Sequence, residues 1–252
     1  MPDNKIALVT GASRGLGRNT VLSLARRGVN SIITYRSRKD EADAVVREIE
    51  GLGAAAIALQ LDTANVTSFP SFTNAVSASL KSLGADRIDF LVNNAGTGLH
   101  KGIADTSEDE FDALCNIHFK GVFFLTQALL PLIRDGGRIV NLSSGLTRIV
   151  IPNMAAYAAM KGAVETLTKY MAKELGPRGI AVNVVAPGAI ETDFGGGMVR
   201  DDAEMNRYIA SNTALGRVGL PDDIGPMIAS LLSEDNRWVN AQRIEVSGGQ
   251  SI

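Results

Sequence analysis

A tyrosine and a lysine lie four residues apart in the stretch AAYAAMKG, residues 155–162. The neighbouring residues are small and compatible with a helix, in which Tyr157 and Lys161 would share one face, one turn apart. A tyrosine has an ordinary pKa of about 10 and transfers protons poorly near neutral pH. A cation about 5 Å away, at an effective dielectric constant of about 20, would favour the ionised phenol by roughly 3 kcal/mol. We therefore expect Lys161 to lower the pKa of Tyr157 towards the working pH.

A pair of serines adds a third polar group. Ser143 and Ser144 follow the apolar run GRIVNL, and Ser144 lies thirteen residues before Tyr157. Side chains alternate across a strand, so only one of the two serines should face the tyrosine helix. Without a further polar group, the tyrosine–lysine pair could equally be a buried core tyrosine next to a lysine whose amine reaches solvent. A serine at the end of a strand favours proton transfer to a carbonyl or alcohol oxygen.

A glycine-rich turn, TGASRGLG, follows the first apolar run with the spacing G-x-x-x-G-x-G. Glycines let a backbone turn sharply and approach a pyrophosphate, whose charge is met by the amides at the start of the next helix. A purely structural turn is the alternative. No Gly-Lys-Ser/Thr follows, which argues against a nucleotide-hydrolase phosphate loop. The residues of this turn that we assign to a dinucleotide are Gly11, Ser13, Arg14, Gly15, Leu16 and Gly17.

The end of the second apolar run should decide which dinucleotide is bound, because a carboxylate there would bind the ribose of NAD. The sequence is TYRSRKDEAD, and its first carboxylate, Asp40, is expected inside the next helix. The run ends instead on Tyr35, Arg36 and Ser37, and guanidinium groups form paired hydrogen bonds to phosphate oxygens. We predict NADP(H) in preference to NAD(H), with Arg36 the first contact to the 2'-phosphate, Arg14 the second and Ser37 the third. Exposed arginines on a solvated loop are the alternative.

Short apolar runs alternate with longer amphipathic stretches along the chain, which is typical of a parallel sheet joined by crossover helices. Most runs are apolar on both faces, as strands between two helix layers should be. We expect one α/β domain, residues 1–252, with a doubly wound parallel sheet of about seven strands and helices on both faces. The strands are predicted at 5–10, 31–35, 55–61, 89–93, 137–142, 181–186 and 242–246, and the helices at 15–28, 39–52, 67–83, 108–133, 155–176, 199–211 and 221–233.

The composition narrows the classes of partner. The 252 residues are 45% hydrophobic and 21% charged, enough for one substantial core, and the formal net charge is -2. The 25 basic residues are scattered, so we expect a small-molecule partner and no nucleic acid. Cys115 is the only cysteine, which excludes an internal disulfide, and no metal-ligand spacing is present. The start MPDNKIALVT lacks a signal-peptide core and no apolar run approaches roughly 20 residues, so we expect a cytoplasmic protein with no membrane association.

Six motifs, in order and over nearly the whole chain, resemble the short-chain dehydrogenase/reductase (SDR) family. The resemblance implies a Rossmann-like fold and a dinucleotide-dependent oxidoreductase. The sequence departs from the family pattern in two small ways. Thr63 stands where the family often has a valine after the aspartate that contacts the adenine, and VNAQ at 239–242 replaces ITGQ. The motifs are TGASRGLG at 10–17, NNAG at 93–96, Asn116, NLSSG at 141–145, YAAMK at 157–161 and PGAIET at 187–192.

The resemblance also implies roles for individual residues. Its spacing selects Ser144 over Ser143 as the group that holds the substrate oxygen. Asn116 would hold a local helix distortion and an ordered water that links Lys161 to solvent, while His100 and His118 receive no catalytic role. The implied catalytic residues are Asn116, Ser144, Tyr157 and Lys161. The implied cofactor contacts outside the glycine turn and the 35–37 cluster are Asp62, Asn93, Ala95, Gly96, Tyr157, Lys161, Pro187, Gly188, Ile190 and Thr192.

The expected function is NADPH-dependent reduction of a ketone or aldehyde, or the reverse oxidation of a secondary alcohol, by direct hydride transfer. The alternative is a non-catalytic NADP(H)-binding redox sensor that acts through a protein partner. Three consecutive glycines, 195–197, suit a hinge, so residues 193–218 are a candidate substrate lid, although a floppy surface loop has the same composition. Apolar residues in VFFLTQALLPLI and in the helix after Tyr157 favour a homotetramer, with core packing inside one chain as the competing explanation. The substrate, its stereochemistry and the reaction direction are not specified by the sequence.

Overall fold

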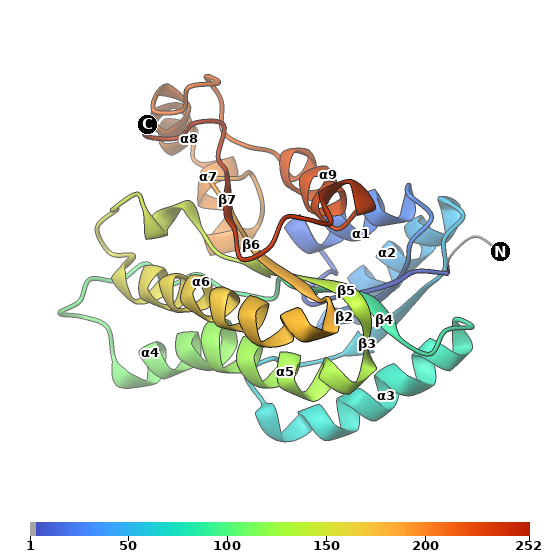
Figure 1. Cartoon of the computed structure of the whole chain (residues 1–252). Coiled ribbons are helices and arrows are strands. Elements are labelled where there is room, and N and C mark those ends of the chain that lie inside the picture. The colour runs from blue at the N-terminus through green and yellow to red at the C-terminus, as the bar shows by residue number, and fades with distance from the viewer. Residues whose placement is uncertain (1–3) are drawn as a thin grey trace.

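The computed structural model describes residues 4–252, so residues 1–3 of the expected domain lie outside the described residues. Seven parallel strands form one sheet in the order β3-β2-β1-β4-β5-β6-β7 (Figure 1). The prediction of a doubly wound α/β fold is confirmed. The strands are β1 (Ile6–Val9), β2 (Asn30–Tyr35), β3 (Ala56–Gln60), β4 (Ile88–Asn93), β5 (Ile133–Leu142), β6 (Ala181–Pro187) and β7 (Arg243–Val246).

Helices cover both faces of this sheet (Figure 1). One face carries α1, α2 and α9, and the other carries α3, α5 and α6. The helices are α1 (Gly15–Ala25), α2 (Lys39–Gly51), α3 (Phe69–Ser82), α4 (Glu108–Cys115), α5 (Gly121–Leu129), α6 (Ala155–Leu175), α7 (Met198–Asp201), α8 (Ala203–Ser211) and α9 (Pro221–Leu231).

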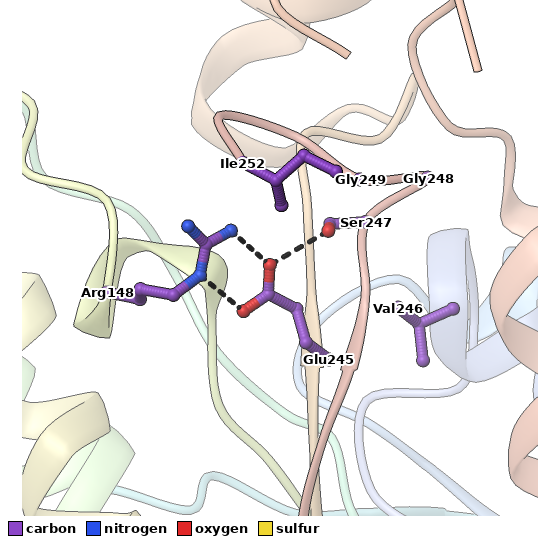
Figure 2. Close-up of a pocket in the computed structure, with 7 residues that line it drawn as sticks. All are labelled: Arg148, Glu245, Val246, Ser247, Gly248, Gly249 and Ile252. Carbon is purple, nitrogen blue, oxygen red and sulfur yellow. Dashed lines mark hydrogen bonds and ion pairs between the residues drawn. The ribbon is translucent and has the colours of Figure 1, made fainter. Parts of the chain in front are cut away.

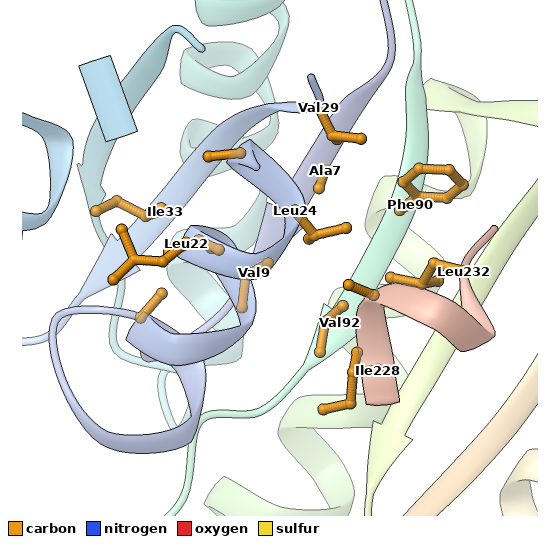
Figure 3. Close-up of a cluster of buried hydrophobic side chains, with 14 of the residues drawn as sticks. Ala7, Val9, Leu22, Leu24, Val29, Ile33, Phe90, Val92, Ile228 and Leu232 are labelled. Atoms are coloured by element: carbon orange, nitrogen blue, oxygen red, sulfur yellow. The ribbon is translucent and has the colours of Figure 1, made fainter. Parts of the chain in front are cut away.

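Alternating side chains of each central strand enter two separate hydrophobic cores, which explains why the strands are apolar on both faces. In β1, Val9 enters the core beneath α1 and α9, whereas Leu8 enters the core beneath α3 and α5. Figure 3 shows the first core, in which Val9 and Val92 of neighbouring strands lie near Leu22 of α1 and Ile228 of α9.

The predicted helix at 108–133 is wrong at its end, because its last residue, Ile133, already belongs to β5. The distortion expected at Asn116 is present and takes the form of a π-helix at Asn116–Lys120. A short 3-10 turn that contains Pro131 separates α5 from β5. An apolar run predicts burial but does not tell a helix end from the start of a strand, so the boundary was misplaced.

The predicted helix at 199–211 is also divided. Asp202, whose extended backbone ends α7, accepts hydrogen bonds from the amides of Glu204 and Met205 and so caps α8. An aspartate at this position satisfies two amides that would otherwise lack acceptors at the start of the helix.

The segment Glu108–Leu132 has the length and composition of a membrane span, with a hydropathy of 1.3. In this fold it consists of α4, the π-helix and α5, and it packs against the sheet and the neighbouring helices (Figure 1). Leu125 and Leu129 are fully buried in the second core. Packing inside the fold therefore accounts for only part of its apolar character, since Phe123 and Phe124 stay 39% and 37% exposed.

The strand order reverses direction between β1 and β4, which are neighbours although two strands separate them in the sequence. In open α/β sheets, ligands bind outside the carboxyl ends of the strands at such a point. The glycine-rich turn follows β1 and the NNAG motif follows β4. The sheet therefore brings these two motifs together at the carboxyl ends of β1 and β4.

Candidate active site

The glycine-rich turn packs directly against the NNAG loop. A Cβ atom on Gly11 would lie 2.9 Å from Cα of Ala95, and one on Gly17 would lie 2.6 Å from Nδ2 of Asn94. Gly11 also has a φ of +64°, which favours glycine. Asn94 donates hydrogen bonds to the carbonyl oxygens of Thr10 and Gly11, at 2.8 and 3.0 Å. Close packing of the two loops therefore requires glycine at both positions.

The start of α1 fits an anionic ligand. Its N-cap residue, Arg14, provides no side-chain acceptor for the first-turn amides, and Gly15 adopts a φ of +56°. Free amides at the start of a helix bind phosphate groups. These features match a pyrophosphate in the cradle formed by the glycine turn.

The two arginines expected at the 2'-phosphate lie on the surface near this cradle. Arg36 is 3.5 Å from Asp62, with 72% of its side chain exposed, and Arg14 is 3.4 Å from Asp193. Exposed ion pairs are worth little, so both guanidinium groups can exchange a carboxylate for a phosphate. The residues present therefore fit NADP(H).

Two of the expected cofactor contacts have buried side chains. The side chain of Tyr35 is 9% exposed and packs in the first core. Asn93 is buried and donates to Thr126 and Asn141, between β5 and the helices, at 3.0 and 2.8 Å. Sequence reasoning missed Asn94 as the residue that braces the glycine turn. The signal was available, because Asn94 follows the last residue of the strand.

The PGAIET segment is fixed by the end of the chain. The amide of Ala189 donates to Oε1 of Gln250 at 2.9 Å, and a Cβ atom on Gly188 would lie 2.8 Å from the same oxygen. Thr192 faces Gly15 of the glycine turn, 3.9 Å from the position of a Cβ atom on that glycine. Of the other expected contacts, Pro187 ends β6 and Ile190 forms an isolated bridge with Gly219.

Tyr157 and Lys161 lie one turn apart near the start of α6 and are both buried, at 6% and 5% exposure. Nζ of Lys161 is 5.6 Å from the centroid of the Tyr157 ring and donates to the carbonyl oxygen of Leu142 at 2.8 Å. Ser144 lies close enough to Tyr157 to affect the pKa of the phenol, and its Oγ accepts from the amide of Leu146 at 3.2 Å, whereas Ser143 turns away and donates to Glu165 at 2.6 Å. The structure thus brings Ser144, Tyr157 and Lys161 together.

The expectation that Lys161 lowers the pKa of Tyr157 is wrong for this structure. Burial raises the pKa of Tyr157 well above its ordinary value, and Ser144 offsets only part of the effect. Burial also lowers the pKa of Lys161 to about 8. Loss of water on burial therefore dominates the shift of the Tyr157 pKa. The phenol therefore keeps its proton and is a proton donor.

The π-helix brings an unexpected residue to the site. It begins at Asn116, whose carbonyl oxygen accepts a hydrogen bond from the amide of Gly121. His118, 1% exposed, places its ring perpendicular to that of Tyr157, with 5.2 Å between the ring centroids. Burial, followed by the nearby charge of Lys161, lowers the pKa of His118 to about 3, so the imidazole is neutral. Sequence reasoning gave this histidine no role.

The candidate lid contacts the same tyrosine. The ring of Phe194 lies 5.7 Å from that of Tyr157, centroid to centroid, and the ring is 43% exposed. A Cβ atom on Gly98 would lie 3.2 Å from this phenylalanine. The next three residues, 195–197, have φ values of 62°, 78° and 80°, which suit glycine alone.

A polar network extends beneath the serine loop to β7. Glu165 accepts hydrogen bonds from Ser143, Thr147 and Arg243, at 2.6, 2.7 and 2.8 Å. Figure 2 shows the adjoining pocket, where Arg148 pairs with Glu245. None of the residues that line this pocket was expected in the site: they are Arg148, Glu245, Val246, Ser247, Gly248, Gly249 and Ile252.

The fold and this edge of the sheet define a dinucleotide-binding oxidoreductase. A family model described as enoyl-(acyl carrier protein) reductase matches residues 11–251. The chain is 37% identical over 256 residues to the hydroxynaphthalene reductase-like protein Arp2 of Metarhizium brunneum. The matched region covers 97% of this chain and 94% of the relative. The chain belongs to the short-chain dehydrogenase/reductase family.

Two solved structures are similar over almost their full length. The promiscuous reductase LugOII, which catalyses keto-reduction at C1 during lugdunomycin biosynthesis, has a TM-score of 0.92 at 37% identity, covering 97% of this chain and 96% of that one. The angucycline C-6 ketoreductase LanV with bound NADP has a TM-score of 0.92 at 34% identity, covering 98% and 95%. The protein is an NADP-dependent enzyme of this family, and these similarities give no support to the redox-sensor alternative.

The pKa of about 8 for Lys161 predicts the pH dependence of ketone reduction. The amine is charged below this pKa and neutral above it, so kcat/KM should fall as the pH rises through about 8. Tyr157, with its raised pKa, and His118, with a pKa of about 3, do not titrate there. Lys161→Arg, whose guanidinium stays charged, should move this decline upward by more than about one pH unit. Initial rates between about pH 6 and pH 10 check this, and the same decline in both proteins would contradict it.

Proposed function

We propose that this protein reduces a ketone or aldehyde with NADPH by direct hydride transfer, or runs the same reaction in reverse on a secondary alcohol. One observation carries the proposal: the buried phenol of Tyr157 has Ser144 beside it and the amine of Lys161 at 5.6 Å from its ring centroid. The named activities of the similar proteins support the same reaction class. Because several of these names refer to fused-ring compounds, fused-ring ketones are the first substrates to test.

NADPH, when bound, supplies the hydride to the carbonyl carbon. Tyr157 donates its phenolic proton to the oxygen on which negative charge develops, and Ser144 donates a hydrogen bond to the same oxygen. Lys161 stabilises the phenolate left on Tyr157 and would hold the nicotinamide ribose of the bound cofactor. These donors are in place before the reaction, so they stabilise the developing charge without reorganisation. Asn116 enters this proposal through its backbone carbonyl, which accepts the hydrogen bond that forms the π-helix.

Residues 193–218 act as a lid over the substrate in this proposal. The contact of Phe194 with Tyr157 supports it, because a carbonyl compound must approach the same phenol. The three left-handed glycines provide a hinge next to that phenylalanine. Phe194, Met198 and the partly buried Leu146 and Met154 present an apolar lining, which suits an apolar substrate of medium size.

The preference for NADP over NAD is carried by Arg36, with Arg14 and Ser37 as further contacts. Arg36→Ala removes the guanidinium that pairs with the 2'-phosphate, so we expect the Kd of NADPH to rise at least about tenfold while that of NADH changes less than about twofold. Fluorescence titration of both cofactors measures this. Arg47→Ala, an exposed arginine on the far part of α2, is the matched control. Equal losses for the two cofactors would rule out the phosphate contact.

Removal of the phenolic oxygen tests the proposed acid. Tyr157→Phe should lower kcat by at least about a thousandfold and leave the Kd of NADPH nearly unchanged, because the ring still fills its place and only the proton donor is lost. The assay follows NADPH absorbance with a panel of fused-ring ketones, open-chain ketones, aldehydes and quinones. A Tyr157→Phe protein that still turns over any of these at the unmodified rate would disprove the assignment.

A cytoplasmic homotetramer completes the proposal. Phe123 and Phe124 of α5 stay 39% and 37% exposed and Tyr170 of α6 stays 64% exposed, so packing inside one chain does not cover them. Helices α4, α5 and α6 form one outer layer, where second copies of the chain can bury these rings (Figure 1). Cys115 is a free thiol, in keeping with a reducing compartment.

The assembly is checked by light scattering on the purified protein, which should give the mass of four chains. Phe123→Ser combined with Phe124→Ser should lower this mass, because it removes the apolar area that drives association. A monomer for the unmodified protein would refute the assembly. A mass that does not change in the double variant would show that these rings are not in the interface.

A further inference from the structure

We propose that His118 is a positioning residue of this active site: its imidazole ties the Gly96–Thr97 turn to the ring of Tyr157, and so fixes the phenol relative to the loop that lines the cofactor site. The inference rests on the proposed function, because it concerns the placement of the proposed acid. His118 acts through Tyr157 and takes no part in proton transfer itself.

The tie to the turn is a short hydrogen bond. Nε2 of His118 lies 2.7 Å from the carbonyl oxygen of Thr97 and 3.3 Å from the amide nitrogen of the same residue. A carbonyl oxygen only accepts, so Nε2 carries the hydrogen in this contact. Gly96 packs against the same ring, because a Cβ atom there would lie 2.7 Å from Cε1 of His118. The turn thus rests on the imidazole through both a hydrogen bond and direct contact.

The tie to Tyr157 is an edge contact between rings. The two rings are perpendicular with 5.2 Å between their centroids, a favoured geometry for an aromatic pair. Tyr157 packs in a small cluster with Leu114 and Met160. Rings and apolar side chains of fixed position therefore surround the tyrosine, and His118 is the one among them that is also bonded to the NNAG loop.

The local backbone gives this histidine its place. His118 is the buried residue of the π-helix, and π-helical turns inside α-helices are frequent at functional sites. Its neutral state suits a position near the Lys161 ammonium, because a second cation in this buried cluster would repel the first. A neutral donor can therefore hold the turn without disturbing the charge that the reaction uses.

Two substitutions separate the two contacts of the imidazole. His118→Phe keeps a ring against Tyr157 and removes the donor to Thr97. His118→Gln places an amide nitrogen at about the reach of Nε2 and so keeps the donor without the ring. His100→Gln is the matched control, because His100 is exposed and is the other histidine of the chain.

Hydrogen exchange and steady-state kinetics provide independent readouts. In the protein without ligands, His118→Phe should speed amide exchange at Asn94 and Ala95, which both donate to Oγ1 of Thr10 at 2.9 Å, by at least about tenfold, because the adjoining loop loses its anchor. With a ketone from the panel, kcat should fall at least about tenfold while KM and the Kd of NADPH change less than about twofold. His118→Gln should keep exchange slow, because it keeps the donor to Thr97, but should still lower kcat, because it removes the ring that packs against Tyr157. His100→Gln should change neither.

The outcomes are distinguishable. Unchanged exchange in a folded His118→Phe protein overturns the inference whether or not the unmodified protein reduces any ketone. Unmodified protein that is inactive on the whole panel disproves the proposed function, and the exchange result still decides the role of His118. A lower melting temperature with wild-type kcat would show a merely structural role and also overturn the inference. If His118→Phe does not fold, His118→Leu replaces it with the same expected exchange and kcat.

Discussion

The cost of holding a lysine ammonium out of water governs this active site. Lys161 is 5% exposed and its amine donates to one backbone carbonyl, that of Leu142. The structure gives it no carboxylate partner among residues 4–252. Burial lowers its pKa from 10.5 to about 8, which corresponds to roughly 3 kcal/mol against the charged form. A fold tolerates such a cost when the surrounding groups are rigid and neutral, and the nearby hydroxyls and the imidazole are both.

Hydrogen bonds between the loops at the carboxyl ends of the strands position the remaining residues of the site. Asn94 bonds the backbone of the glycine turn, and the imidazole of His118 bonds the NNAG loop one step further on. Deeper in the fold, Asn93, Asn141 and Thr168 form a buried chain of hydrogen bonds that joins β4, β5 and α6. The loops that carry the chemistry therefore rest on a polar core that is fully paired at these contacts, which keeps their positions relative to the sheet.

Much of the fold was predictable because the strands are apolar on both faces and glycine turns separate them from helices. The expected strands at 31–35, 137–142 and 181–186 each lie inside a real strand, whereas the extension of β5 back to Ile133 was missed behind Pro131. The tyrosine and lysine were also found from sequence, because helix periodicity fixes which side chains share a face. Strand alternation left Ser143 and Ser144 open, and the resemblance to the family selected Ser144. The direction of the Tyr157 pKa was not predictable, since burial dominates it and only the structure gives burial. His118 lies four residues after the buried Leu114, and this helical spacing was a signal that favoured it over Asn116 for the inward position.

The end of the chain is part of this site. Gln250, third from the last residue, accepts from Ala189 beside the PGAIET segment, and Arg148 bonds the carbonyl oxygens of Gln250 and Ser251. Loss of residues 250–252, or a tag fused directly after them, would therefore disturb the PGAIET segment although it alters nothing in the sheet. Protein intended for kinetic work is better prepared with these three residues present and unmodified.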